Sequence, residues 1–143
     1  MQQPIRGYQE AYAGRGPEPD PDLVRTGSFL PGTGFRFASA LLGQHELPTA
    51  IISGGIDMLS GVLRAVRSHG LSIPGDVSII AAGRSELAEL HTPPISVVSW
   101  DQAEVGRIAA GLLPDRLRAN APQEGRHVLV PNEFILRASV GPP

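Results

Sequence analysis

The stretch PTAIISGGIDMLSGVLRAVRSHG, residues 48–70, decides the fold class. Its first six residues form a short apolar run after a proline, which is typical of a buried parallel strand. From Ile56 to Val66 the apolar residues recur at helical spacing, and Gly70 closes that pattern. A strand, a glycine corner at residues 54–55 and a helix therefore follow one another, which indicates an α/β fold.

The sequence on both sides continues this alternation. Buried strands are predicted at residues 77–82 and 95–100, and each is followed by a helical pattern. Asp101 stands in the N-cap position of the last helix, and Pro114 predicts a bend or an end in it. The other predicted elements are a helix at 5–16, a loop at 17–22, a strand at 23–29, a turn at 30–34, helices at 35–44, 83–90 and 101–119, and two strands around a turn at 131–132 within 126–140. The predicted class is α/β with a parallel, Rossmann-like sheet.

Four strand ends are candidates for a ligand site. In open parallel sheets a ligand binds beyond the carboxyl ends of the strands, where the strand order switches. The residues there are Gly27–Phe29, Gly54–Gly55, Gly83–Arg84 and Ser99–Trp100. Trp100 is the only tryptophan, and it is either a core or interface residue or a platform on which a sugar ring stacks.

The composition limits the kind of protein. The chain has 143 residues, 41% of them hydrophobic, which suits one domain with one core. No apolar run reaches the ~18 residues of a membrane-spanning helix, and the N-terminus lacks the apolar region of a secretory signal, so a cytoplasmic location away from membranes is expected. The net charge is −2, and the 12 basic residues, all arginine, are scattered. The chain by itself is therefore not expected to bind nucleic acid.

No metal, cofactor or catalytic centre is predicted. There is no cysteine, and the four histidines are too far apart in sequence for a helical metal site. In PGTGFRF a phenylalanine replaces the third glycine of a dinucleotide fingerprint, and without lysine no G-x-x-x-x-G-K phosphate loop can exist. Ser53, Asp57 and His91 show no triad spacing, and Glu86 and Glu89 are expected to be solvated charges. The chain is therefore not expected to be an enzyme.

Two long segments carry a resemblance to a known family. PTAIISGGIDMLSGVLRAVRSHGLSIPGDVSII and the later TPPISVVSWDQAEVGRIAAGLL resemble the lactose-repressor (LacI/GalR) family of transcriptional regulators. The matching motifs are P-T-A at 48–50, G-V-L-R-A at 61–65, I-P-G-D-V-S at 73–78, P-P-I at 93–95 and the G-x-x-A spacing at 106–109, and IRGYQEAYAG at 5–14 resembles the family's R-G-F/Y segment. The resemblance covers nearly the whole chain.

The resemblance implies a domain organisation. Residues 1–143 would be a fragment of the family's periplasmic-binding-protein-like (type I) sensor domain, with the C-terminal subdomain at roughly 20–143. No helix-turn-helix is recognised in the sequence. A full regulator would need one upstream of Met1, together with most of the sensor's N-terminal subdomain. Operator DNA would then be reached only through a helix-turn-helix missing from this chain.

The resemblance also implies an effector site for a sugar-like or anionic small molecule. The family's N-D pair falls on Gly55 and Ile56, its G-F-D-D motif on residues 81–84 and its contact arginine on Pro4, so several partners for sugar hydroxyls are replaced. Backbone N–H groups exposed at the Gly54–Gly55 corner would favour an anion. The candidate ligand-binding residues are Phe29, Gly54, Gly55, Ile56, Asp57, Gly83, Arg84, Trp100 and Gln102.

The family forms dimers, so the resemblance implies a homodimer. The candidate interface residues lie at 56–70 and 86–94 and are Leu59, Val62, Leu63, Leu87 and Leu90. The alternative is that the helix face in the first segment simply covers the sheet. Two other functions stay open at this point, a stand-alone or transport-type ligand-binding module and a small α/β enzyme.

Overall fold

A computed structural model describes residues 2–13, 16, 20–117 and 124–142. Within these residues the chain forms a mixed α/β fold around a four-stranded sheet of order β1-β2-β3-β4. The three parallel strands are β1 (Ala50–Ser53), β2 (Ser78–Ala82) and β3 (Ser96–Trp100). The fourth, β4 (Asn132–Ile135), runs antiparallel to β3. The predicted strands at 77–82 and 95–100 and the one after Pro48 are confirmed as parallel strands, and β4 is the second of the two strands predicted within 126–140, here antiparallel to β3.

The register separates the two faces of the sheet. Ile51 lies beside Ile79, and Val97 lies beside both Ala81 and Ile135. Since side chains alternate along a strand, these residues all point to one face. Ile51, Ile79, Ala81 and Val97 are buried and belong to the main hydrophobic core.

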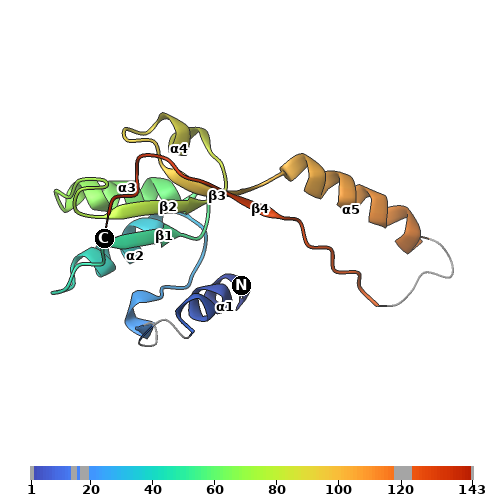
Figure 1. Ribbon diagram of the computed structural model, residues 1–143, viewed down its shortest axis with the longest axis horizontal. Helices are drawn as coiled ribbons and strands as arrows, with labels where there is room; N and C mark the ends of the chain where they lie inside the picture. Colours follow the sequence, from blue (N-terminus) through green and yellow to red (C-terminus); the bar gives the residue numbers. More distant parts are fainter. Residues whose placement is uncertain (1, 14–15, 17–19, 118–123, 143) are drawn as a thin grey trace.

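Two helices cover this buried face. They are α2 (Pro31–Leu42) and α3 (Met58–Ser68), which pack closely together beside β1 and β2 (Figure 1). Their close approach depends on two glycines, because a Cβ at Gly61 would overlap the carbonyl oxygen of Pro31 and a Cβ at Gly34 would overlap that of Met58. The core consists of Ala38, Leu42, Ile51, Leu59, Val62, Ala65, Val66, Val77, Ile79, Ala81, Ala88, Ile95 and Val97.

The remaining helices lie at the margins. The short α4 (Glu86–Leu90) connects β2 to β3, and α1 (Gln2–Tyr12) is followed by the 3-10 turn at Pro21–Leu23. Helix α5 (Gln102–Leu117) extends away from the sheet, as Figure 1 shows. Most of its described side chains are accordingly exposed, and Leu117 retains 77% of its accessible surface.

A buried serine fastens the C-terminal segment to the sheet. Ser139 Oγ donates to the Ile79 carbonyl at 2.6 Å and accepts from the Ser96 N–H at 2.8 Å, while the Ile79 N–H donates to the Ser139 carbonyl at 2.9 Å. The start of β2 and the start of β3 are thus bridged by one residue. Arg137, two positions earlier, is held beside the same strands by its N–H bond to Ser96 Oγ at 2.9 Å.

Several predicted elements differ from the structure. The strand at 23–29 is wrong, because no strand of the described sheet pairs with it and Gly27 packs on the Phe37 ring of α2 instead. The segment before β4 is not a strand either, since pairing with β3 begins only at Asn132. Helix α2 begins at Pro31 and so takes in most of the predicted turn, because proline fits the first helical position. Residues 14–15 and 118–119, near the ends of predicted helices, and residues 17–19 of the predicted loop at 17–22 lie outside the described residues.

Candidate functional site

Two hollows open at the carboxyl ends of the parallel strands, and Trp100 borders both. We call the first the glycine hollow; it has a volume of about 250 Å³ and is lined by Phe29, Gly54, Gly55, Ile56, Asp57, Ala82 and Trp100. We call the second the acidic hollow; it has a volume of about 600 Å³ and is lined by Gly83, Arg84, Ser99, Trp100, Asp101, Gln102, Ala103, Pro131 and Glu133. This is the place where parallel α/β sheets bind ligands.

The corner after β1 shapes the glycine hollow. A Cβ at Gly55 would lie 2.5 Å from Cδ1 of Phe29, so only glycine lets that ring close over the corner. Ser53 Oγ donates to the Gly55 carbonyl at 3.3 Å and fixes the turn. Asp57 takes the N-cap position of α3, where its side chain makes no capping hydrogen bond. The glycines therefore form a wall of the hollow beneath an aromatic ring.

Gly83 joins the two hollows. Its φ of +90° lies in the region that favours glycine, and its N–H donates to the Val98 carbonyl at 2.7 Å. A Cβ at this position would lie 2.5 Å from Cγ1 of Ile56 and 3.6 Å from the Trp100 ring. Glycine is thus required for β2 to end this close to the side chains of the neighbouring strand ends.

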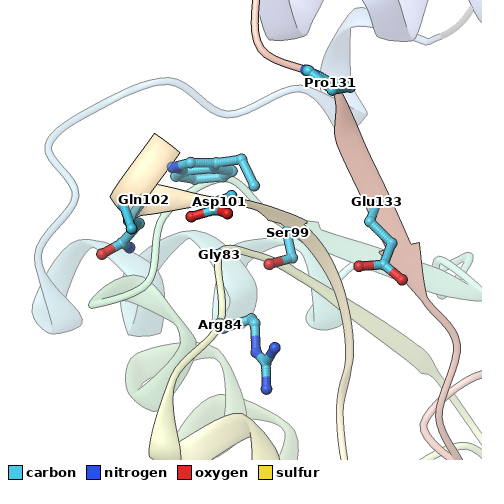
Figure 2. A pocket seen from close by; sticks show the side chains of 9 residues that line it. Gly83, Arg84, Ser99, Asp101, Gln102, Pro131 and Glu133 are labelled. Carbon is cyan, nitrogen blue, oxygen red and sulfur yellow. The ribbon is translucent and has the colours of Figure 1, made fainter. Parts of the chain in front are cut away.

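Polar groups from three elements meet in the acidic hollow. Figure 2 shows Asp101 and Glu133 on opposite sides of Ser99. Asp101 Oδ1 accepts the Glu104 N–H at 3.0 Å and caps α5, as the sequence predicts. Ser99 and Glu133 are neighbours because β4 pairs with β3 in that register. The site therefore depends on a strand far along the chain.

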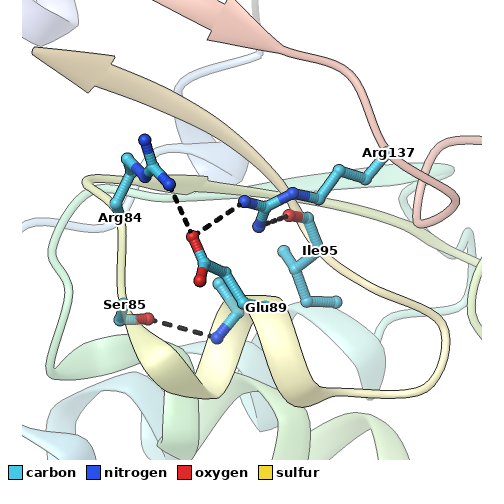
Figure 3. Close-up of polar contacts among 6 residues, drawn as sticks. Arg84, Ser85, Glu89, Ile95 and Arg137 are labelled. Atoms are coloured by element: carbon cyan, nitrogen blue, oxygen red, sulfur yellow. Dashed lines mark hydrogen bonds and ion pairs between the residues drawn. The ribbon is translucent and has the colours of Figure 1, made fainter.

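Arg84 borders the same hollow but is held by another residue. Glu89 Oε1 accepts from Arg84 Nη2 at 3.0 Å and from Arg137 Nη2 at 3.2 Å (Figure 3). Arg137 Nη1 also donates to the Ile95 carbonyl at 2.9 Å. The hydrogen bond and charge of Arg84, with the charge of Arg137, hold the pKa of Glu89 below its ordinary value. Ser85 caps α4 by accepting the Ala88 N–H at 3.2 Å, which fixes the helix that carries Glu89.

All nine ligand-binding residues predicted from the sequence line one or other hollow. The structure brings them together, and their role in binding stays a prediction. The sequence prediction placed Ser99 at one of the four strand ends but did not name it as a ligand contact. It did not include Asp101, Glu133 or Pro131 as contacts, nor Glu89 as the partner of Arg84. The pairing of β4 with β3, which brings Glu133 to the site, has no local signal in the sequence. The side chain of Pro4 lies outside the described part of the chain.

The predicted interface residues divide into two groups. Leu59 and Val62 are 0% and 3% exposed inside the core, and Leu63 packs against that core. The prediction that they face a second subunit is therefore corrected to the alternative, in which this helix face covers the sheet. Leu87 and Leu90, on α4, are 40% and 73% exposed and stay available as interface candidates.

The described residues contain no group of three or more metal-ligating side chains. Within the same residues no helix combines the length and the hydropathy needed to cross a bilayer.

The fold and the hollows at its strand ends define a class, the small-molecule-binding α/β domains. The periplasmic binding protein-like domain family matches residues 2–140, and the chain belongs to this family. Within it, the chain corresponds to part of the sensor domain of LacI-type regulators, as the following relatives show.

Curated relatives are transcriptional repressors. The lactose operon repressor of Rhizobium radiobacter is 37% identical over 111 residues, which are 78% of this chain and 96% of that protein. The HTH-type transcriptional repressor MelR of Bacillus subtilis (strain 168) is 33% identical over 86% of this chain, but the match covers only 35% of its length. This chain thus spans about a third of that relative.

Solved structures agree with this assignment. The transcriptional regulator CelR in complex with cellobiose has a TM-score of 0.84 and 29% identity, covering 94% of this chain and 41% of that one. A regulatory protein of the LacI family from Chloroflexus aggregans has a TM-score of 0.82 and 28% identity, covering 98% of this chain and 50% of that one. The chain therefore has the sensor-domain fold of LacI-type regulators, and it spans about half the length of these solved chains.

Proposed function

We propose that this chain is the effector-binding part of a LacI/GalR-type transcriptional regulator and that it binds a sugar or a related small molecule between its strand ends. The observation that carries the proposal is the pair of hollows on either side of Trp100, where all nine predicted contact residues meet. Trp100 is 37% exposed, so its ring is accessible to a ligand. An aromatic face beside polar groups suits a sugar, which has apolar faces and hydroxyl edges.

The comparisons support this assignment. The similar structures include a regulator in complex with cellobiose, and the curated relatives named above are repressors. A regulator of this type acts by coupling two sites, since effector binding changes the affinity of a DNA-binding part for its operator. We place that DNA-binding part in a longer protein, because the relatives that exceed this chain in length are named as helix-turn-helix repressors. We propose that this longer protein acts as a homodimer in the cytoplasm. The relatives are regulators, so we propose no catalytic step.

The fluorescence of Trp100 tests the proposal directly. It is the only tryptophan, so any change in its emission reports on this site. The chain, checked for folding by circular dichroism, is titrated with glucose, galactose, cellobiose and lactose, and each response is verified by calorimetry. We expect saturable binding of at least one sugar. A folded chain whose emission and heat show no binding of any sugar would contradict the proposed function.

A DNA-binding assay separates the proposal from a transport-type module. In the complete regulator, the same sugar should change the mobility shift of an operator fragment. Binding of the sugar with no effect on DNA would favour the stand-alone module instead.

A further inference from the structure

The one arginine in the acidic hollow is turned out of it. Figure 2 shows the Arg84 guanidinium directed away from Asp101 and Ser99. Its Nη2 donates instead to Glu89 on α4 at 3.0 Å, as Figure 3 shows. A carboxylate partner partly neutralises a guanidinium and so weakens its attraction for a second anion. The one arginine that lines the hollow is thus partly neutralised by Glu89.

Two carboxylates remain directed at the hollow. The Glu133 carboxylate forms no hydrogen bond or ion pair with any described residue, and of the Asp101 carboxylate only Oδ1 is engaged, with the Glu104 N–H. They lie on opposite sides of Ser99 (Figure 2). In the neighbouring glycine hollow the only ionisable residue is Asp57. The charges that border the two hollows thus favour a cation over an anion.

Ser99 gives an independent sign of a polar ligand. This residue is only 5% exposed, and its hydroxyl has no hydrogen-bond partner among the described residues. Figure 2 shows the hydroxyl directed toward the space beside Gly83 and Arg84. Because its oxygen lines the hollow and is accessible from it, a ligand atom at this place can form the hydrogen bond that the described residues do not supply. A ligand hydroxyl or amine fits the position.

Trp100 adds a surface that suits the same ligand. A ring face attracts both the C–H face of a sugar and a nearby cation. Together with the proposed function, on which this inference rests, the geometry points to one class of effector. We propose that the acidic hollow selects a sugar carrying a protonated amino group over its neutral or phosphorylated counterparts, with Glu133 and Asp101 facing the amino group. This proposal replaces the anionic ligand implied by the glycine corner, because the Asp57 carboxylate lines the same hollow and would repel an anion.

Matched sugars test the selection. Binding is measured by Trp100 fluorescence and by calorimetry in three series of ligands. The first compares glucose, glucosamine and glucose 6-phosphate, and the second compares the corresponding galactose derivatives. The third compares cellobiose with the β-1,4-linked glucosamine dimer. The titrations are run at a pH where the amino groups are protonated. In at least one series we expect the amino sugar to bind about tenfold tighter than the neutral sugar, and the phosphate to bind more weakly than both. Equal binding of amino and neutral sugars, or tighter binding of a phosphate, overturns this inference and leaves the proposed function standing. Absence of binding in every series contradicts the proposed function as well.

Variants assign the selection to its residues. Glu133→Gln should remove most of the preference for the amino sugar while leaving the affinity for the neutral sugar unchanged. Glu86→Gln, an exposed residue of α4 that does not line the hollow, is the matched control and should keep the preference. Ser99→Ala should weaken amino and neutral sugars alike. A preference that survives Glu133→Gln in a variant with normal circular dichroism would overturn the assignment.

Discussion

At the scale of single residues, Gly83 is a position in the site where one added methyl group should lower stability. A side chain there would combine an unfavourable φ of +90° with a Cβ 2.5 Å from Ile56 Cγ1. Gly83→Ala should therefore lower the free energy of unfolding by about 2 kcal/mol. Since Ile56 lines the glycine hollow, any sugar affinity should fall as well. Urea denaturation gives the first quantity and calorimetry the second.

Gly106→Ala is the control for this substitution. Gly106 lies inside α5 with nothing within 4 Å of a Cβ at this position. Alanine should therefore stabilise the helix by about 0.5–1 kcal/mol. If the two variants lost the same stability, strain at Gly83 would not be the cause.

The contact between Glu89 and the two arginines predicts a dependence of stability on pH. Arg84, and then Arg137, lower the pKa of Glu89 in the folded chain below its ordinary value of 4.5. A carboxyl whose pKa falls on folding stabilises the fold above its unfolded pKa, and this contribution is lost as the pH falls through the folded pKa. The difference in urea midpoint between the wild type and Glu89→Gln should thus be present at pH 7 and shrink below pH 4.5. A difference that is constant from neutral to acid pH would contradict the ionic contribution.

At the scale of elements, Asp101 has two separable roles. Its Oδ1 caps α5 through the Glu104 N–H, and its carboxylate lies in the acidic hollow. Asp101→Ala should lower the stability of α5 by about 1 kcal/mol, because one N–H at the helix start loses its partner. Asp101→Asn keeps a capping oxygen and should leave the helix content unchanged while removing the charge. Circular dichroism during thermal unfolding compares the two variants, and equal losses would show that the cap does not stabilise α5.

The elements also show what local sequence can and cannot predict. The corner between β3 and α5 was predicted because a buried strand, an N-cap aspartate and a helical pattern follow one another within residues 95–104. The strand at 23–29 had the right composition but finds no neighbouring strand in the described sheet, and its Gly27 packs on Phe37. Pairing is a property of two segments, so composition alone could not exclude it.

The same reason limits the prediction of the site. The nine candidate residues follow from local corners and from the family resemblance, and they all reach the hollows. Glu133 reaches the acidic hollow only because β4 pairs with β3 across more than thirty intervening positions. Glu89 is exposed, as expected of a solvated charge, but the sequence did not predict that it binds two arginines, one of them 48 positions away. Contacts between residues so far apart in the sequence leave no periodic pattern from which they could be predicted.

At the scale of the whole molecule, the described surface carries large apolar side chains. Ile52 on β1 and Phe134 on β4 are 61% and 52% exposed, and Leu113 and Leu117 on α5 are 57% and 77% exposed. Such surfaces favour association, and an unspecific aggregate must therefore be distinguished from a defined dimer. A defined dimer has one mass over a range of protein concentrations, whereas an aggregate does not.

Helix α4 offers the sharper test of dimerisation. Ala88 is fully buried and anchors this short helix, so Leu87 and Leu90 face outward at 40% and 73% exposure. In a two-fold dimer each residue is present twice at the interface, and a substitution therefore acts twice. Leu90→Glu should place two desolvated charges in the interface and convert a dimer to a monomer of unchanged fold, measured by light scattering after gel filtration.

Leu47→Glu, which changes a leucine that is 48% exposed in the segment before β1, is the control and should keep the dimer mass. A dimer mass retained by Leu90→Glu would show that the subunits meet elsewhere, whereas loss of the dimer in both variants would show only a general sensitivity of the surface to added charge.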